Sequence, residues 1–158
     1  MPRYEATVVI EAPPEVVWEV LTDLARYPDW NPLTPAVRSN LRVGSPVDLQ
    51  VSMWRGRLRF WQRERVATVE APRQLDWGVR MLGGAIVGMR TQKVEPLGDG
   101  QSRYTTVDTI TGPLAPLVEM LFGDSLRVGF AGVAAGLRGA SETLHERRAS
   151  LPSPELEQ

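Results

Sequence analysis

The chain has 158 residues, enough for one domain with a sizeable buried core. Its 18 basic and 19 acidic residues leave a formal net charge of −1 at pH 7, so no global field attracts nucleic acid or membranes. Cysteine is absent, which excludes disulfides, thiolate catalysis and cysteine-ligated metal sites.

The first 35 residues predict a strand followed by two short helices. Residues 3–11 alternate and are rich in Val, Ile and Thr, as in a strand, and they lack the apolar core of a signal peptide, so we expect a cytoplasmic protein. From Glu15 onward the apolar residues keep to one helical face. Pro28 and Pro32 disfavour helix in the residues before them, so residues 25–35 are predicted to be a short helical turn followed by a loop.

Residues 47–110 predict a meander of antiparallel strands. A two-residue turn at Arg55-Gly56 pairs Val51 with Phe60 and Met53 with Leu58. The next turns pair Val66 with Trp77, Trp77 with Arg90, Arg90 with Asp108, and Val94 with Tyr104. All four turns assign the same residues to one face, and a one-residue slip at any of them would destroy that agreement.

One face of this sheet is apolar and the other is charged, as in an antiparallel sheet with one solvated face. The apolar face carries Val47, Leu49, Val51, Met53, Leu58, Phe60, Val66, Leu75, Trp77, Val79, Met81, Ile86, Val94, Tyr104 and Ile110. The charged face carries Arg57, Arg59, Arg63, Arg65, Asp76, Arg80 and Lys93.

A long helix from Pro113 to about Arg148 is predicted to cover the apolar face, with a bend or interruption near residues 123–125. Its most apolar run, residues 128–137, is about half the ~20 residues that a membrane span needs. Glycines recur along one face of this helix at Gly129, Gly132, Gly136 and Gly139. They indicate either close packing of the helix on the sheet or space for a ligand. Residues 1–148 form the predicted domain, and 149–158 a disordered tail.

This order of elements, and three stretches in particular, resemble a known family. VVWEVLTDLARYPDWNP, the Gly98-Asp99-Gly100 hairpin and TGPLAPLVEML are similar to the polyketide cyclase/dehydrase and lipid-transport group of the START-like (birch-pollen-allergen-type, SRPBCC) superfamily, over roughly residues 3–147. The resemblance implies an α+β helix-grip fold, in which a curved antiparallel sheet wraps around a long C-terminal helix. It also implies a small hydrophobic ligand in a cavity between them. Tyr27, Trp30 and Leu33 would then form either a gate to that cavity or a plug in the core.

Several polar residues fall on the predicted inner face, where burial is costly unless they are paired. Arg90 and Asp108 lie opposite each other, which indicates either a structural ion pair or a polar anchor for a ligand. An enzyme of this type needs no cofactor, and the candidate catalytic residues are Glu64, Arg90, Tyr104 and Asp108. His145 is expected on the surface, and neither a catalytic triad nor a metal-ligand cluster is visible.

We therefore expect a carrier, sensor or cyclase/dehydrase-like protein without cofactor or metal, as a monomer or homodimer, with no integral membrane association. The predicted ligand-binding residues are Trp30, Val51, Met53, Phe60, Gln62, Glu64, Trp77, Val79, Met81, Arg90, Gln92, Tyr104, Thr106, Asp108, Gly129 and Val133.

The outer sheet face supports a different class of function. Five arginines between Arg55 and Arg65 share it with Trp54 and Trp61, a combination common at protein–protein hot spots. The alternative is therefore an interaction module for a protein partner or a second copy. Nucleic acid is not expected, because Asp48 opposes Arg63 and weakens the positive stripe.

Overall fold

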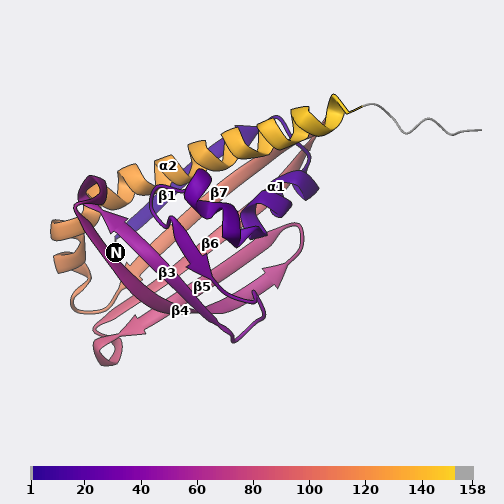
Figure 1. The fold of residues 1–158 in the computed structure, drawn as a ribbon. Coiled ribbons are helices and arrows are strands. Elements are labelled where there is room, and N and C mark those ends of the chain that lie inside the picture. Colours follow the sequence, from indigo (N-terminus) through magenta and orange to yellow (C-terminus); the bar gives the residue numbers. More distant parts are fainter. Residues whose placement is uncertain (1, 152–158) are drawn as a thin grey trace, which may run out of the picture.

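A curled antiparallel sheet and one long helix make up most of the computed structural model, which describes residues 2–151 (Figure 1). The strands in this part are β1 (Arg3–Ile10), β2 (Ala36–Arg38), β3 (Pro46–Met53), β4 (Leu58–Glu70), β5 (Gln74–Met81), β6 (Ile86–Gly98) and β7 (Gln101–Thr111). The helices are α1 (Pro14–Thr22) and α2 (Ala115–Ala149), with the 3-10 turns η1 (Leu24–Asp29), η2 (Trp54–Gly56) and η3 (Leu82–Gly84). The predicted α+β helix-grip fold is confirmed. Most of the predicted tail, residues 152–158, lies outside the described residues.

The strands are ordered β1-β7-β6-β5-β4-β3-β2, and every neighbouring pair is antiparallel. The register is the predicted one: Met53 pairs with Leu58, Val66 with Trp77, and Arg90 with Asp108. The turn between β3 and β4 has four residues rather than two, because Trp54 and Arg55 both adopt positive φ before Gly56. The register is unaffected, since the four-residue turn still begins after Met53 and ends before Leu58.

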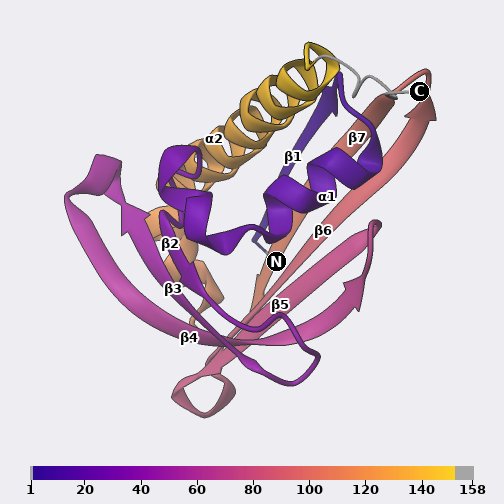
Figure 2. The same ribbon diagram turned by 45° about the vertical axis from the view of Figure 1, so that its right-hand side comes forward.

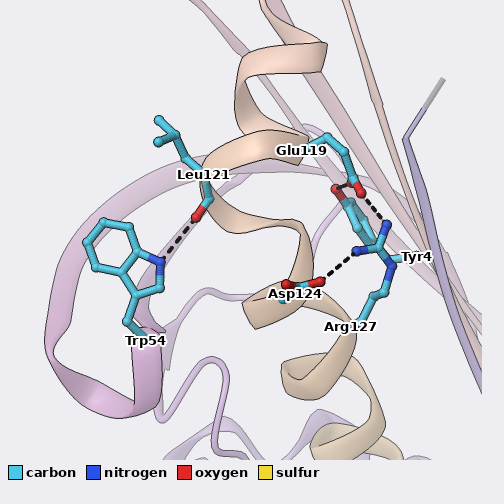
Figure 3. Close-up of polar contacts among 6 residues, drawn as sticks. All are labelled: Tyr4, Trp54, Glu119, Leu121, Asp124 and Arg127. Carbon is cyan, nitrogen blue, oxygen red and sulfur yellow. Dashed lines mark hydrogen bonds and ion pairs between the residues drawn. The ribbon is translucent and has the colours of Figure 1, made fainter.

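Two residues that were predicted on the solvated outer face differ from that prediction. Asp76 lies on the outer face but is only 7% exposed, and Gln74 Nε2 donates to its Oδ2 at 2.7 Å. Its neighbours in the register are Thr68 and Thr91. Trp54 is at the tip of the β3–β4 turn and packs on α2 rather than on the outer face (Figure 3).

The helix α2 crosses the concave side of the sheet and runs along β1 (Figures 1 and 2). It is uninterrupted through Gly123, so the predicted interruption near residues 123–125 is wrong. Among residues 2–151, α2 is the one helix long and apolar enough to cross a membrane by length and composition. In this fold part of that apolar surface is buried against the sheet.

The glycines of α2 serve a contact that the sequence did not indicate. A Cβ on Gly129 would lie 2.7 Å from Leu33, and one on Gly132 would lie 2.7 Å from Pro32. At Gly136 the added atom would lie 2.0 Å from the carbonyl oxygen of Trp30. The row therefore accommodates the segment after η1, residues 30–33, rather than the sheet. The predicted close packing of these three glycines on the sheet is therefore wrong.

Candidate functional site

A partly open cavity of about 230 Å³ lies between the sheet and the N-terminal half of α2. At the other end of the sheet the core is filled by fully buried side chains, including Leu21, Leu75, Tyr104, Val133 and Leu137. The cavity is lined by Leu33, Thr34, Leu49, Val51, Met53, Phe60, Gln62, Glu64, Trp77, Val79, Met81, Ile86, Gly88, Arg90, Asp108, Ile110, Val118, Phe122, Leu126 and Phe130. Most of these are apolar, and the polar groups are few, as in sites that orient a small ligand.

The strands supply the polar groups because inward-facing side chains alternate along them. Arg90 on β6 is 6% exposed and lies 5.7 Å from the ring centre of Trp77 and 5.0 Å from that of Phe130. Its Nε donates to Thr106 Oγ1 at 3.2 Å, while Nη2 is buried without a partner among the described residues. The two rings and Thr106 stabilise the guanidinium in place, and one donor group is left for something else.

Arg90 and Asp108 face each other in the β6–β7 register, as predicted. However, among the described residues no salt bridge joins Arg90 to Asp108. The predicted structural ion pair is therefore wrong as a direct contact. Burial raises the pKa of the Asp108 carboxyl to about 7, against the lowering effect of nearby Arg90. A carboxyl in this state carries only part of a negative charge at neutral pH and leaves the charge of Arg90 incompletely balanced.

Glu64 on β4 is the second carboxyl of the cavity. Burial raises its pKa to about 7, and Asp108 adds to this effect, while Arg90 and a hydrogen bond from Gln62 act in the opposite direction. Gln62 Nε2 donates to Glu64 Oε2 at 3.0 Å. Two carboxyls with a pKa near neutrality can each give or take a proton.

Of the predicted site residues, ten line the cavity together: Val51, Met53, Phe60, Gln62, Glu64, Trp77, Val79, Met81, Arg90 and Asp108. Another four are buried in the adjoining core: Gln92, Tyr104, Thr106 and Val133. There Tyr104 donates its hydroxyl proton to Gln92 Oε1 at 2.7 Å, and burial raises the pKa of Tyr104. Trp30 and Gly129 are outside the cavity and line a wide surface groove.

The residues with which α2 lines the cavity were not among the predicted site residues. Val118, Phe122, Leu126 and Phe130 follow one another at intervals of four residues, so they form a single row along α2. That spacing is the signal that identifies them. Thr34 was also missed, since it stands in an irregular segment whose side-chain directions no periodicity reveals.

Leu33 forms part of the wall between the cavity and the surface groove and contributes to both. Its segment is held by Asn31, whose Oδ1 accepts from the backbone N–H groups of Leu33 and Thr34 at 3.2 and 2.8 Å. The carbonyl oxygen of Leu33 also accepts from Ser52 N–H of β3 at 2.8 Å. The other predicted gate residues are Tyr27 and Trp30. Tyr27 is 1% exposed and donates its hydroxyl proton to Leu21 O. Trp30 packs edge-on against the ring of Tyr27, with the ring centres 4.8 Å apart.

A curled sheet, a long helix across its concave side and an apolar cavity with few polar groups define a protein of the helix-grip class. The chain matches the family described as "Polyketide cyclase / dehydrase and lipid transport" over residues 1–143, and it belongs to that family. No protein with a curated description matches it in sequence.

Solved structures with the same fold are distant in sequence. Protein NE0264 from Nitrosomonas europaea is 18% identical, with a TM-score of 0.66, and the match covers 94% of this chain and 97% of that one. The di-domain ARO/CYC BexL from the BE-7585A biosynthetic pathway is 15% identical, with a TM-score of 0.69, covering 90% of this chain and 47% of that one. Ara h 8.0201 is 11% identical, with a TM-score of 0.66, covering 89% and 97%. At these identities the likeness establishes the fold alone.

Proposed function

We propose that the protein binds a small, mostly apolar ligand in the cavity, with one oxygen of the ligand accepting a hydrogen bond from Arg90. The observation that carries this proposal is the buried Nη2 of Arg90, which has no partner in the described chain, on a residue that lines an apolar cavity. A buried donor left unsatisfied costs about 1–3 kcal/mol, and a ligand oxygen removes that cost. A carboxylate, phenolate or enolate oxygen also balances the charge of the guanidinium.

The size of the cavity restricts the ligand. Sites for drug-sized molecules measure roughly 300–1,000 Å³, and this cavity is smaller, at about 230 Å³. The ligand that fits is therefore small, such as a compact aromatic or isoprenoid-like acid, and a diacyl lipid does not fit. This proposal applies equally to a carrier and to a sensor.

A second candidate, cofactor-free cyclase or dehydratase activity, is favoured by the two carboxyls. Glu64 and Asp108 both have a pKa near 7 and line the same cavity as the Arg90 cation. Arg90 can stabilise an enolate oxygen while one carboxyl moves a proton, which is what carbon–carbon bond formation or loss of water next to a carbonyl requires. Likeness to BexL supports this candidate only through the shared fold.

The test uses Arg90→Met, which keeps an unbranched side chain and removes the charge and the donors. We expect the affinity for the compact anionic probe 1-naphthoate to fall by roughly 10- to 100-fold, because a hydrogen bond to a charged group contributes about 1.5–3 kcal/mol. The affinity for the neutral probe 1-methylnaphthalene is expected to fall little. Equal loss for both probes, or none for the anionic one, would contradict the anchor.

Native mass spectrometry of protein from its own host then separates the two candidates. A co-purified compound recovered unchanged after incubation supports binding alone. A compound converted by the wild type but not by Glu64→Gln or Asp108→Asn supports catalysis.

A further inference from the structure

The two hairpin turns at one end of the sheet have the same unusual backbone conformation. Trp54, Arg55 and Gly56 have φ values of 51°, 56° and 84°, and Leu82, Gly83 and Gly84 have values of 52°, 66° and 98°. A bulky residue at positive φ is an outlier, and such strain gathers at functional positions. In each turn the first residue is a large apolar one that stays exposed: Trp54 is 44% exposed and Leu82 is 73% exposed.

The beginning of α2 adds more exposed apolar surface at this end. Leu117, Met120 and Leu121 are 44%, 73% and 46% exposed. Figure 1 shows α2 beginning at the end of the sheet where both turns lie, and the Leu114 N–H donates to Ala85 O beside the second turn. We call Trp54, Leu82, Leu117, Met120 and Leu121 together the apolar rim.

This rim is continuous with the cavity wall. The indole of Trp54 stacks on Phe122 with ring centres 5.3 Å apart, and Phe122 lines the cavity. Trp54 Nε1 also donates to Leu121 O at 3.1 Å (Figure 3). The residues next to the two turns, Met53 and Met81, line the cavity as well. An apolar molecule on the rim is therefore separated from the cavity by one layer of side chains.

Positive charge accompanies the rim on the β3–β4 hairpin. Arg55, Arg57 and Arg59 are exposed, line the surface groove and form no ion pair with any residue between 2 and 151. The groove also contains the carboxylates of Asp29 and Asp124. Asp124 lies 3.3 Å from Arg127, which also pairs with Glu119, so that the charges on α2 offset one another (Figure 3). The three arginines thus form a local cationic patch on a chain of net charge −1.

We propose that the apolar rim and the three arginines dock the protein on an anionic lipid surface, so that the end of the cavity nearest the rim faces the bilayer. Exposed apolar side chains beside Arg are the combination that interfacial membrane binding requires, and Trp favours the headgroup region. A second copy docked by a two-fold axis through the rim places the arginine patches of both copies close together, which opposes self-association. The proposal goes beyond ligand binding and is tested without any ligand.

The first test compares sedimentation with phosphatidylcholine vesicles and with mixed phosphatidylcholine–phosphatidylglycerol vesicles. We expect partitioning to the mixed vesicles that weakens as salt increases. The triple variant Arg55→Gln, Arg57→Gln, Arg59→Gln is expected to partition on the order of 100-fold less, because each basic residue near an anionic surface contributes about one decade or less. The control triple Arg42→Gln, Arg73→Gln, Arg147→Gln changes exposed arginines at the opposite end of the sheet and is expected to partition like the wild type.

The second test addresses the apolar part with Leu82→Ser and Met120→Ser. Both side chains are 73% exposed, so folding is expected to be unaffected, while partitioning falls on the order of tenfold. Failure of the wild type to bind the mixed vesicles, or equal partitioning of the two arginine triples, would overturn the proposal. So would a concentration-dependent dimer, detected by light scattering, that the rim substitutions abolish. Loss of probe binding to the cavity without loss of vesicle binding would contradict only the ligand proposal.

Discussion

Filling the cavity from within distinguishes unfilled space from a site that is already well packed. Gly88 on β6 lines the cavity opposite Val79, and the one atom within 4 Å of a Cβ placed there is Val79 Cγ1, at 3.4 Å. The substitution Gly88→Leu therefore directs four carbon atoms into the cavity without a backbone clash. If each carbon takes about the ~30 Å³ share of a water molecule, the side chain fills on the order of 100 Å³ of the roughly 230 Å³ available.

The Gly88→Leu substitution is expected to increase stability and to decrease the affinity for a probe. The free energy of unfolding is expected to rise by about 2 kcal/mol, since burying a leucine side chain contributes about 1.5–3 kcal/mol and replacing a strand glycine adds about 0.5–1, less the side-chain entropy. For a chain of this size that corresponds to an increase of roughly 4–8 °C in Tm. The affinity for 1-naphthoate is expected to fall at least tenfold, because the remaining space is too small for the probe.

Urea unfolding and probe titration measure the two effects on the same samples. The control is Gly139→Leu, which adds the same side chain on the exposed side of α2, where nothing lies within 4 Å of the new Cβ. It is expected to stabilise the helix by up to about 1 kcal/mol and to leave probe binding unchanged. A Gly88→Leu variant destabilised by about 1–3 kcal/mol, the usual cost of overpacking, would refute the reasoning, because it would mean that the site has no free volume.

Two further predictions concern pH and helix packing. Because the pKa values of Glu64 and Asp108 are raised in the folded state, the native protein binds more protons than the unfolded chain between about pH 4 and pH 7. The free energy of unfolding therefore falls as pH rises through that window. Urea titrations at pH 5 and pH 8 measure this fall, and Glu64→Gln is expected to reduce it by on the order of 2 kcal/mol. An unchanged pH dependence in the variant would contradict the raised pKa of Glu64. Gly136→Ala is expected to destabilise by at least about 1 kcal/mol despite the better helix propensity of alanine, because its Cβ would meet Trp30 O at 2.0 Å. Gly139→Ala is the matched control and is expected to stabilise, so a stabilised Gly136→Ala would contradict the close contact.

The sheet could be predicted because the residues that set its register are close together in the sequence and several turns give the same result. Each hairpin turn fixed the register of its two strands, and the four turns agreed on which residues face inward. The alternation therefore places Glu64, Arg90 and Asp108 on one surface, and all three line the cavity. The three-residue strand β2 was missed, since it follows a proline-rich segment and is too short to show a period.

Contacts between segments far apart in the chain were not predictable in the same way. The glycine row of α2 indicated that something approaches the helix, but only the fold shows that it is the segment of residues 30–33. Likewise, the register placed Arg90 between Trp77 and Asp108, but it could not reveal that the guanidinium also lies over the ring of Phe130. Side-chain direction depends on the completed core, since the ring of Phe130 arrives from a different element.

The two walls that separate the cavity from the exterior differ in how firmly they are held, and this bears on the route of a ligand. The segment containing Leu33 is fixed by two backbone hydrogen bonds to Asn31 Oδ1, by the bond from Ser52, and by the glycine row of α2. Opening this wall breaks all of these contacts together. On the rim side, Trp54 is held by one backbone and one side-chain hydrogen bond and stays 44% exposed. A local opening that breaks fewer buried contacts occurs more often. For the proposed ligand, we therefore expect exchange at the rim, next to Phe122, rather than through a gate formed by Tyr27, Trp30 and Leu33.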